Sequence, residues 1–336
     1  MSRTMPAWRA PGSGGRIERD RVPVPAPAPD EVLVRVLTCG VCRTDLHVVD
    51  GELPPRRPLL TPGHQIVGEV VQRGTSCTRM AVGDLVGIAW LRSTCGACRF
   101  CRSGRENLCP AARFTGWDED GGYAGYAVVR EAFAYPLPAG SDPVRVAPLL
   151  CAGIIGFRAL QRAQLPPGGR LAVFGFGSSA SLAAQVARAG GTEVVVVSRG
   201  ERNRALAREL GFAVTAGEDV LPDREVDAAI VFAPAGGMVP QALAVTAPGG
   251  TVVLAGIHMT DIPPLVYERT LFHERDLRSV TANTRADGDA FLAVAAHLAL
   301  APAVTTYPFD RLPDALDDLR SATSGGSLVL TAPSGT

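Results

Sequence analysis

Thiol and imidazole side chains gather in the stretch CGVCRTDLHVVDGELPPRRPLLTPGHQ, which spans residues 39–65. Cys42, Thr44, Asp45, His47 and His64 all lie within it. Zinc takes thiolate and imidazole ligands, and a catalytic zinc uses three protein ligands and keeps one position open. Cys42 and His64 can supply two of the three. The stretch therefore predicts a catalytic metal site whose third ligand lies elsewhere in the chain.

A second group of thiols lies in the segment CGACRFCRSGRENLC, which places cysteines at Cys95, Cys98, Cys101 and Cys109. Four cysteines at such short spacings can close a tetrahedral site, and a site of this kind is a structural zinc with no position left for a substrate. Two disulfides or an iron–sulfur cluster would use the same residues. Clustered cysteines in a cytoplasmic chain favour a metal over disulfides, so the segment predicts a structural zinc.

The composition limits the classes of function. A chain of 336 residues is long enough for two domains, and its formal charge of zero gives no electrostatic reason to expect nucleic acid or an anionic membrane surface as a partner. The N-terminus has no apolar core like that of a signal peptide, and the apolar segment 290–301 is shorter than the about 20 residues that cross a bilayer. We expect a soluble, cytoplasmic protein.

All 33 basic residues are arginine. The absence of lysine excludes Schiff-base catalysis, a P-loop lysine and the Tyr-x-x-x-Lys pair of short-chain dehydrogenases.

The first part of the chain has the pattern of an all-β domain. Apolar residues alternate in the segments 31–37, 64–74 and 84–88, and glycine and proline turns separate these segments. Such alternation is typical of half-buried strands. We expect a barrel-like domain with the candidate metal ligands at strand ends and in loops.

From residue 170 the pattern changes to alternating apolar strands and helices. The turn Gly175-x-Gly177-x-x-Ala180 directly follows the apolar segment RLAVF and precedes a helical pattern. In this position the glycines indicate a dinucleotide site, because they permit a tight turn and bring backbone N–H groups close to a pyrophosphate at the helix N-terminus.

Later segments extend this pattern into an open parallel sheet and then into a tail that we expect to rejoin the first domain. The predicted strands are 226–232, 251–256, 277–281, one near Thr305, and 327–331; the predicted helices are 239–246, 289–300 and 313–321.

The second strand of this region ends in Ser198-Arg199-Gly200. A carboxylate at this point would bind the ribose 2′-hydroxyl of NAD, whereas a hydroxyl and a guanidinium can hold a 2′-phosphate. The residues favour NADP(H) over NAD(H). Alternatively, Arg199 is a solvated surface charge and Glu201 binds the ribose.

These motifs occur together in one order: CGVCRTDLH, PGHQIVGEV, the cysteine lobe, APLLCAG and GFGSSA. In this the chain closely resembles the zinc-dependent alcohol dehydrogenases of the medium-chain dehydrogenase/reductase family, over nearly its full length. The resemblance implies an α/β fold: a Rossmann domain with a doubly wound parallel sheet at residues 153–283, and a GroES-like β-barrel catalytic domain at residues 1–152 and 284–336. The structural zinc lobe would span about residues 93–112.

The resemblance also implies roles for single residues. Taken alone, Cys151 sits in an apolar run and looks like an inert core residue. By position it matches the third ligand of the catalytic zinc, with Cys42 and His64 as the other two, whereas Cys39 matches no ligand. The remaining matches are Asp45 to a carboxylate that orients the histidine ligand, Thr44 to the hydroxyl that contacts the alcohol oxygen at the metal, His47 to the outer end of a proton relay through the cofactor ribose, and Arg43 to a contact with the cofactor pyrophosphate. A surface histidine is the alternative for His47.

Three positions depart from the family pattern. Gln65 replaces a glutamate next to the histidine ligand, which puts in doubt any step that needs a carboxylate there. Ile155 replaces a threonine near the nicotinamide. The segment Ser324-Gly325-Gly326 lacks an arginine that some relatives direct at the pyrophosphate.

The predicted enzyme is a zinc-dependent alcohol dehydrogenase that prefers NADP(H) and transfers a hydride between nicotinamide and a zinc-bound primary alcohol or aldehyde. A family member that reduces a C=C or C=N bond, and a non-catalytic NADP-sensing protein, are the alternatives. An apolar substrate pocket would be lined by Trp90, Leu91, Leu53 and Phe114, each of which could instead be ordinary core. We expect a small-molecule substrate, two zinc ions per chain, and, by analogy only, a homodimer or homotetramer.

Overall fold

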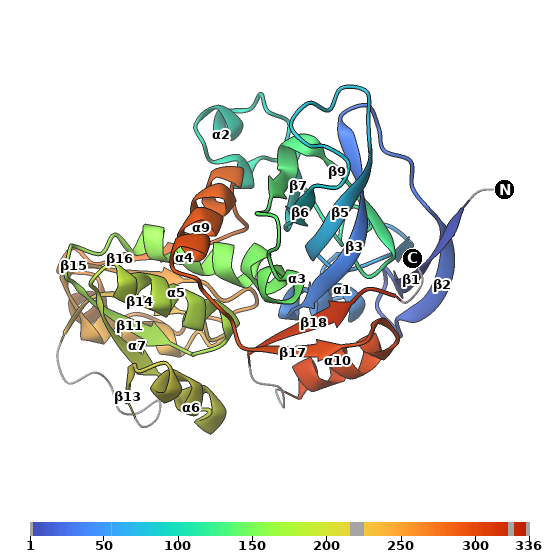
Figure 1. Cartoon of the computed structure of the whole chain (residues 1–336). Helices are drawn as coiled ribbons and strands as arrows, with labels where there is room; N and C mark the ends of the chain where they lie inside the picture. Colours follow the sequence, from blue (N-terminus) through green and yellow to red (C-terminus); the bar gives the residue numbers. More distant parts are fainter. Residues whose placement is uncertain (1–2, 55, 216–224, 322–325, 334–336) are drawn as a thin grey trace. The chain divides into compact units, whose positions relative to one another are not determined.

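The computed structural model describes residues 3–54, 56–215, 225–321 and 326–333, which form two compact units (Figure 1). Unit 1 comprises Met1–Cys151, Ala282–Asp289 and Ala301–Thr336, and unit 2 comprises Ala152–Thr281 and Ala290–Leu300. The division falls inside helix α9 (Arg285–His297). The domain boundaries inferred from the sequence stay a prediction.

Unit 1 is built on a mostly antiparallel sheet of seven strands in the order β10-β6-β5-β3-β18-β17, with β9 also paired to β3. Two smaller sheets, β2-β1-β4 and β7-β8, complete its strands. The bounds are β1 (Thr4–Pro11), β2 (Glu18–Pro23), β3 (Glu31–Val41), β4 (Leu59–Leu60), β5 (Gln65–Arg73), β6 (Leu85–Ile88), β7 (Leu91–Ser93), β8 (Arg113–Phe114), β9 (Tyr126–Arg130), β10 (Ala134–Pro136), β17 (Val304–Tyr307) and β18 (Ser327–Thr331).

The helices of unit 1 are short. They are α1 (Arg43–Val49), α2 (Arg99–Arg102), η1 (Glu106–Leu108), η2 (Glu131–Phe133), α3 (Pro143–Val146), η3 (Ala147–Leu150), η4 (Phe309–Arg311) and α10 (Leu312–Arg320). The last strand, β18, pairs antiparallel with β3, so the C-terminal segment of the chain is part of the same sheet as the N-terminal strands. This outcome matches the expectation that the tail rejoins the first domain.

Unit 2 contains a six-stranded parallel sheet in the order β13-β12-β11-β14-β15-β16. The strands are β11 (Arg170–Phe174), β12 (Glu193–Val197), β13 (Ala213–Thr215), β14 (Val226–Val231), β15 (Thr246–Leu254) and β16 (Asp276–Ser279), and the helices are α4 (Ala152–Ala163), α5 (Ser178–Ala189), α6 (Glu201–Glu209), α7 (Met238–Val245) and α8 (Tyr267–Thr270).

Strand β11 shows why this sheet is covered on both faces. Leu171 and Val173 pack in one hydrophobic cluster with residues of α4, α5 and α6, whereas Ala172 and Phe174 pack in another with residues of α7. Successive side chains of a strand point to opposite faces, so a strand that is apolar throughout needs a cover on each. The strand order and the two covered faces confirm the predicted doubly wound α/β sheet.

Among the described residues, no single helix is long and apolar enough to cross a bilayer. The segment Pro143–Leu150 and helix α4, taken together as a bent pair, meet the length and composition limits.

Candidate functional site

Three predicted metal ligands from distant parts of the chain converge in unit 1. The Nε2 atom of His64 lies 3.4 Å from the sulfur of Cys42 and 3.3 Å from the sulfur of Cys151. All three ligand atoms lie within 4.8 Å of one another. Zinc bonds of about 2.3 Å to sulfur and about 2.0 Å to nitrogen place tetrahedral ligand atoms roughly 3.6 Å apart. The three side chains therefore have the spacing that a single zinc ion requires.

The pairing of β3 with β5 brings Cys42 to His64. Gly40 is the register partner of Gln65, so the end of β3 lies beside the start of β5. Cys42 follows β3 and His64 precedes β5, which places both side chains at the same edge of the sheet.

Cys151 is placed by its neighbour Leu150, the last residue of η3. Leu150 is fully buried, and a Cβ atom on Gly87 of β6 would lie only 2.6 Å from its Cδ2 atom. The missing side chain at Gly87 leaves the space that Leu150 fills, and this contact fixes the end of η3 against the sheet.

Asp45 holds His64 in the orientation that presents Nε2. Its Oδ1 atom accepts hydrogen bonds from Nδ1 of His64 at 3.1 Å and from the backbone N–H of Gly63 at 3.2 Å. Its Oδ2 atom accepts from the backbone N–H of Cys42 at 2.9 Å, as part of the capping box of α1. A carboxylate in this position fixes the histidine tautomer and makes Nε2 the ligand atom.

The electrostatics of the cluster favour a cation. A hydrogen bond with the thiol of Cys151 lowers the pKa of Cys42 well below its ordinary value, although burial acts in the opposite direction. The same bond, together with burial, raises the pKa of Cys151. Burial opposes charge on His64, but the thiolate of Cys42 and the carboxylate of Asp45 raise its pKa to about 10. The groups thus create a negative potential that a bound dication would neutralise, and the donor set fits zinc.

The other residues predicted around this centre all belong to helix α1. Thr44 is buried, and hydrogen bonding from its hydroxyl contributes to lowering the pKa of Cys42. His47 is also buried, whereas Arg43, the first residue of the helix, is exposed. Nδ1 of His47 bonds to the carboxylate of Glu52, a residue that the sequence analysis did not select.

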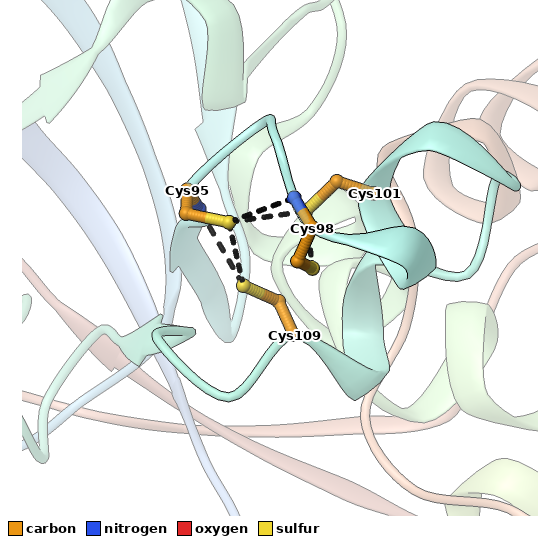
Figure 2. A group of neighbouring side chains, drawn as sticks. All are labelled: Cys95, Cys98, Cys101 and Cys109. Carbon is orange, nitrogen blue, oxygen red and sulfur yellow. Dashed lines mark hydrogen bonds between the residues drawn. The ribbon is translucent and has the colours of Figure 1, made fainter.

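The four clustered cysteines also converge (Figure 2). The sulfur of Cys95 lies 3.5 Å from that of Cys109 and 4.0 Å from that of Cys101, and the sulfurs of Cys98 and Cys101 are 3.5 Å apart. Four sulfurs around one zinc ion at about 2.3 Å would be roughly 3.8 Å apart. The geometry fits one tetrahedral metal ion.

Backbone N–H groups prepare this group to bind a cation. The N–H groups of Ala97 and Cys98 lower the pKa of Cys95 to about 6, and the N–H of Cys98 lies 3.3 Å from the Cys95 sulfur. Burial instead raises the pKa of Cys109 to about 11, so a nearby positive charge is needed to hold this residue as a thiolate.

An ion pair holds the lobe to another segment of unit 1. Glu106 of η1 accepts hydrogen bonds from Nε, Nη2 and the backbone N–H of Arg285, at 2.7–3.2 Å. The Arg285 guanidinium also lies 4.6 Å from the ring centroid of Phe133. Burial opposes ionisation of Glu106, but its bonds to Arg285 keep the pKa of the carboxyl below its ordinary value.

In unit 2 the glycine-rich turn connects β11 to α5. Gly175 has φ = +83°, and a Cβ atom there would lie 3.0 Å from the backbone nitrogen of Ala233. Gly177 is the N-cap of α5, and no atom lies within 4 Å of the position that its Cβ would take. Ala180 is fully buried in the core between helix and sheet. The turn leaves open backbone at the helix N-terminus, as a pyrophosphate requires.

The carboxylate nearest to the end of β12 is engaged in ion pairs. Glu201 bonds to the guanidinium groups of Arg204 and Arg208, and these bonds lower its pKa. Ser198 is buried, and the carbonyl oxygens of Ser198 and Arg199 both accept hydrogen bonds from Arg204. The alternative role of Glu201 as the ribose ligand is thus opposed by its engagement with two arginines.

Aromatic side chains form a stack next to the metal ligands. The ring of Trp90 lies edge-on to His64, with centroids 4.9 Å apart, and stacks on Phe114 at 5.1 Å. Trp117, which the sequence analysis missed, stacks on Trp90 at 6.0 Å and on Phe114 at 5.8 Å. A tryptophan after a glycine in a loop gave no signal, because only the fold brings it to Trp90.

The other two predicted pocket residues lie in different surroundings. Leu53 is half-buried and, with Trp117 and Arg56, lines a small surface pocket. Leu91 is 2% exposed and packs in the hydrophobic core of unit 1. This burial agrees with the core alternative for Leu91, and its role as a pocket residue stays a prediction.

The three departures from the family pattern have different outcomes. Gln65 is buried beside Gly40, where a Cβ atom would lie 2.5 Å from its Oε1 atom. Ile155 lies half-buried in α4. Of the segment 324–326, residues 324 and 325 lie outside the described part of the chain.

Comparison with known proteins shows two matching family models. Residues 28–139 match "Alcohol dehydrogenase GroES-like domain", and residues 180–297 match "Zinc-binding dehydrogenase". These matches confirm both parts of the predicted fold class.

Similar proteins cover nearly the whole chain. A "Probable alcohol dehydrogenase AdhA" of Mycobacterium tuberculosis is 51% identical, over 97% of each chain. A solved structure of a putative zinc-binding dehydrogenase from Sinorhizobium meliloti, bound to NADP, superposes with a TM-score of 0.87 at 28% identity, over 98% of this chain and 99% of that one. Acetophenone reductase from Geotrichum candidum, in complex with NAD, superposes with a TM-score of 0.88 at 26% identity, over 98% of each chain.

Proposed function

The chain belongs to the zinc-dependent alcohol dehydrogenases of the medium-chain dehydrogenase/reductase family, and on that premise we propose that it interconverts primary alcohols and aldehydes with a preference for NADP(H). With NADPH as the donor it works as an aldehyde reductase.

One observation carries the assignment: the convergence of Cys42, His64 and Cys151 in unit 1, with Asp45 behind the histidine. Two sulfurs and one nitrogen at this spacing would hold a zinc ion and would leave one position open for a substrate. A zinc ion held there acts as a Lewis acid that favours ionisation of an alcohol or polarises an aldehyde carbonyl for hydride exchange with nicotinamide.

Residues of α1 move the proton that accompanies hydride transfer. The hydroxyl of Thr44, which contacts Cys42, accepts the proton from the alcohol and passes it outward. His47 receives the proton at the outer end of the path. In aldehyde reduction the same groups deliver a proton in the opposite direction.

The cofactor preference rests on the end of β12. A 2′-phosphate requires cationic or hydroxyl partners and no free carboxylate, and here Glu201 is bound to Arg204 and Arg208. Ser198 and Arg199 supply the partners, and the open backbone at Gly177 receives the pyrophosphate. The similar dehydrogenase from Sinorhizobium meliloti is bound to NADP and the Geotrichum reductase to NAD, so the family fold accommodates both.

The second zinc ion is structural. Cys95, Cys98, Cys101 and Cys109 would supply all four ligands, which leaves no position for a substrate.

Metal analysis and isotope transfer test this proposal together. The purified chain should contain two zinc ions, and NADPH deuterated at the reactive position should transfer the label to the carbonyl carbon of benzaldehyde and of cinnamaldehyde. Cys151→Ser should lose one zinc ion and the activity. Cys77→Ser is the matched control, because Cys77 is a buried thiol whose sulfur lies 3.2 Å from the carbonyl oxygen of Glu31, outside both cysteine groups.

Label at the alkene carbon of cinnamaldehyde would instead show C=C reduction. A single zinc ion with no turnover of either aldehyde would contradict the proposed dehydrogenase.

A further inference from the structure

Tyr123 is a buried side chain that the proposed chemistry has not used. It is completely buried in unit 1, although it carries a polar hydroxyl group. A buried hydroxyl costs free energy unless it forms a hydrogen bond. The carbonyl oxygen of Gly40 lies 3.4 Å from the hydroxyl oxygen, whereas a good O–H···O bond measures about 2.5–3.0 Å. This contact is therefore too long to satisfy the hydroxyl well.

Asp45 offers the hydroxyl a stronger acceptor. Burial raises the pKa of Tyr123 well above its ordinary value, and the negative charge of Asp45 and hydrogen bonding with this carboxylate act in the same direction. A carboxylate has about four acceptor positions on its two oxygens. Apart from Tyr123, three described groups use these positions: the backbone N–H groups of Cys42 and Gly63, and Nδ1 of His64. The fourth position suits the hydroxyl of Tyr123.

The ring of Tyr123 packs on the turn that precedes His64. Gly63 has φ = +94°, and a Cβ atom there would lie 2.7 Å from Cδ1 of Tyr123. The backbone N–H of Tyr123 donates to the carbonyl oxygen of Pro62 at 3.0 Å, and that of Gly122 donates to the carbonyl oxygen of Gly63 at 2.8 Å. The segment that carries Tyr123 thus holds the two residues directly before a candidate metal ligand.

Two glycines allow this close approach. A Cβ atom on Gly121 would lie 2.0 Å from the carbonyl oxygen of Gly63, and one on Gly122 would lie 2.3 Å from Cγ1 of Ile66. Side chains at these positions would push the segment away from the start of β5. The pair Gly121-Gly122 therefore lets Tyr123 lie against the turn that carries His64.

Resting on the function proposed above, we propose that Tyr123 is a further positioning residue of the catalytic metal site. Its hydroxyl donates to Asp45 and its ring supports the turn at Gly63, so that His64 presents Nε2 to the metal. A hydrogen bond to a charged acceptor is stronger than one between neutral groups, so removal of the hydroxyl leaves the carboxylate freer to turn away from Nδ1 of His64. Tyr123 acts through Asp45 and not by contact with the metal.

Metal affinity tests this role without any turnover. Tyr123→Phe keeps the ring and removes the hydroxyl. In a zinc-competition titration this variant should bind zinc at the site of Cys42, His64 and Cys151 roughly tenfold more weakly, at the lower end of the range for the partners of metal ligands. The zinc ion of the four-cysteine lobe should be bound as in the wild type. Co²⁺ at the three-ligand site should show a changed visible absorption spectrum, because this spectrum reports the geometry of the ligands.

Tyr135→Phe is the matched control. Tyr135 is also buried, and its hydroxyl accepts a hydrogen bond from Nδ2 of Asn283 at 3.4 Å. The control variant thus loses a buried tyrosine hydroxyl that is bonded to a residue outside the metal site. It should keep the wild-type zinc affinity and the wild-type cobalt spectrum.

A double-mutant cycle shows whether the effect passes through Asp45. Asp45→Asn replaces the charged acceptor by a neutral amide. In this background Tyr123→Phe should change the zinc affinity by about twofold or less, because the effects of two residues in direct contact are not additive. A tenfold loss in both backgrounds would contradict a role that depends on Asp45.

Wild-type zinc affinity together with a wild-type cobalt spectrum in Tyr123→Phe would overturn the inference. An equal loss of affinity in Tyr135→Phe would also overturn it, because the loss would then be a general effect of removing a buried hydroxyl. Failure of the proposed function would appear differently, as a wild-type protein that binds two zinc ions but turns over neither alcohols nor aldehydes. In that case the affinities and spectra still decide whether Tyr123 positions the metal ligand.

Discussion

Asp45 and His64 are joined by a hydrogen bond of 3.1 Å between Oδ1 and Nδ1, and both side chains are almost completely buried. The other carboxylate oxygen of Asp45 accepts from the backbone N–H of Cys42. One carboxylate thus positions two of the three candidate metal ligands, one through its side chain and the other through its backbone.

Replacing this carboxylate should weaken the metal site without unfolding the protein. Asp45→Asn keeps the size of the side chain, but it removes the negative charge that stabilises a bound cation. Loss of such a partner typically costs 10–100-fold in metal affinity. We expect a zinc-competition titration to show a drop of about this size for one zinc ion and none for the other. Glu69→Gln, at an ion pair with Arg35 on β5, is the control and should bind both ions normally.

Glu106 should make stability depend on pH. Its pKa is lower when folded than when unfolded, so the stabilisation is complete above the unfolded pKa of about 4.3 and is lost as the pH falls through the folded value. Glu106→Gln should lose about 2 kcal/mol at pH 7, the typical contribution of hydrogen bonds to a charged group. In urea denaturation, the difference in the free energy of unfolding between wild type and variant should narrow below pH 4.3. A difference that does not depend on pH would contradict this. Glu18→Gln, on the exposed β2, is the control and should have the free energy of unfolding of the wild type.

The cofactor preference should depend on Arg199. Arg199→Ala removes a guanidinium that can form charge-assisted hydrogen bonds with a 2′-phosphate. The ratio of kcat/KM for NADPH to that for NADH should fall by roughly tenfold or more, because one such bond contributes about 1.5–3 kcal/mol. Arg188→Ala is the control, since Arg188 lies in the last turn of α5, away from its N-terminus. An unchanged ratio in Arg199→Ala would show that the end of β12 does not recognise the 2′-phosphate.

Trp117 should affect catalysis through Trp90. The two rings stack at 6.0 Å with planes 8° apart, and the indole N–H of Trp117 donates to the carbonyl oxygen of Pro54 at 3.1 Å. Trp117→Ala removes a stacking contact that contributes about 1 kcal/mol and leaves Trp90 freer beside His64. We expect KM for benzyl alcohol to rise roughly fivefold, with zinc content unchanged. Trp117→Phe retains an aromatic ring and should stay close to the wild type; equal effects of both variants would refute a stacking role.

The sequence predicted the parts of the site that depend on local pattern. Gly175 and Gly177 stand between a strand and a helix, and this context alone identified the turn. The four cysteines of the lobe are close in the chain, so their spacing alone predicted that their sulfurs would gather at one site. Cys151 required the family resemblance, because a thiol in an apolar run has no local feature that distinguishes a ligand from a core residue.

The residues that the sequence did not reveal depend on tertiary geometry. Glu52 reaches His47 because Gly51 turns the chain back after α1. The backbone of Gly14, in a distant segment, packs directly against this turn, and neither glycine has a side chain that would separate them. Trp117 joins the aromatic stack only after β7 and β8 pair. Leu91 begins β7 and packs in the hydrophobic core of unit 1, and its position next to Trp90 in the chain does not reveal these surroundings.

Gly87 contributes to the metal centre by what it lacks. Its missing methyl group gives Leu150 the space that sets the position of Cys151. A glycine in the middle of a strand normally weakens a sheet, so replacing it by alanine would on propensity alone be expected to stabilise β6. Here the same substitution displaces the residue before a metal ligand. A search for thermostable variants that considers only strand propensity would choose alanine here and would disturb the metal site. Gly87 should therefore be left unchanged when the stability of the enzyme is engineered.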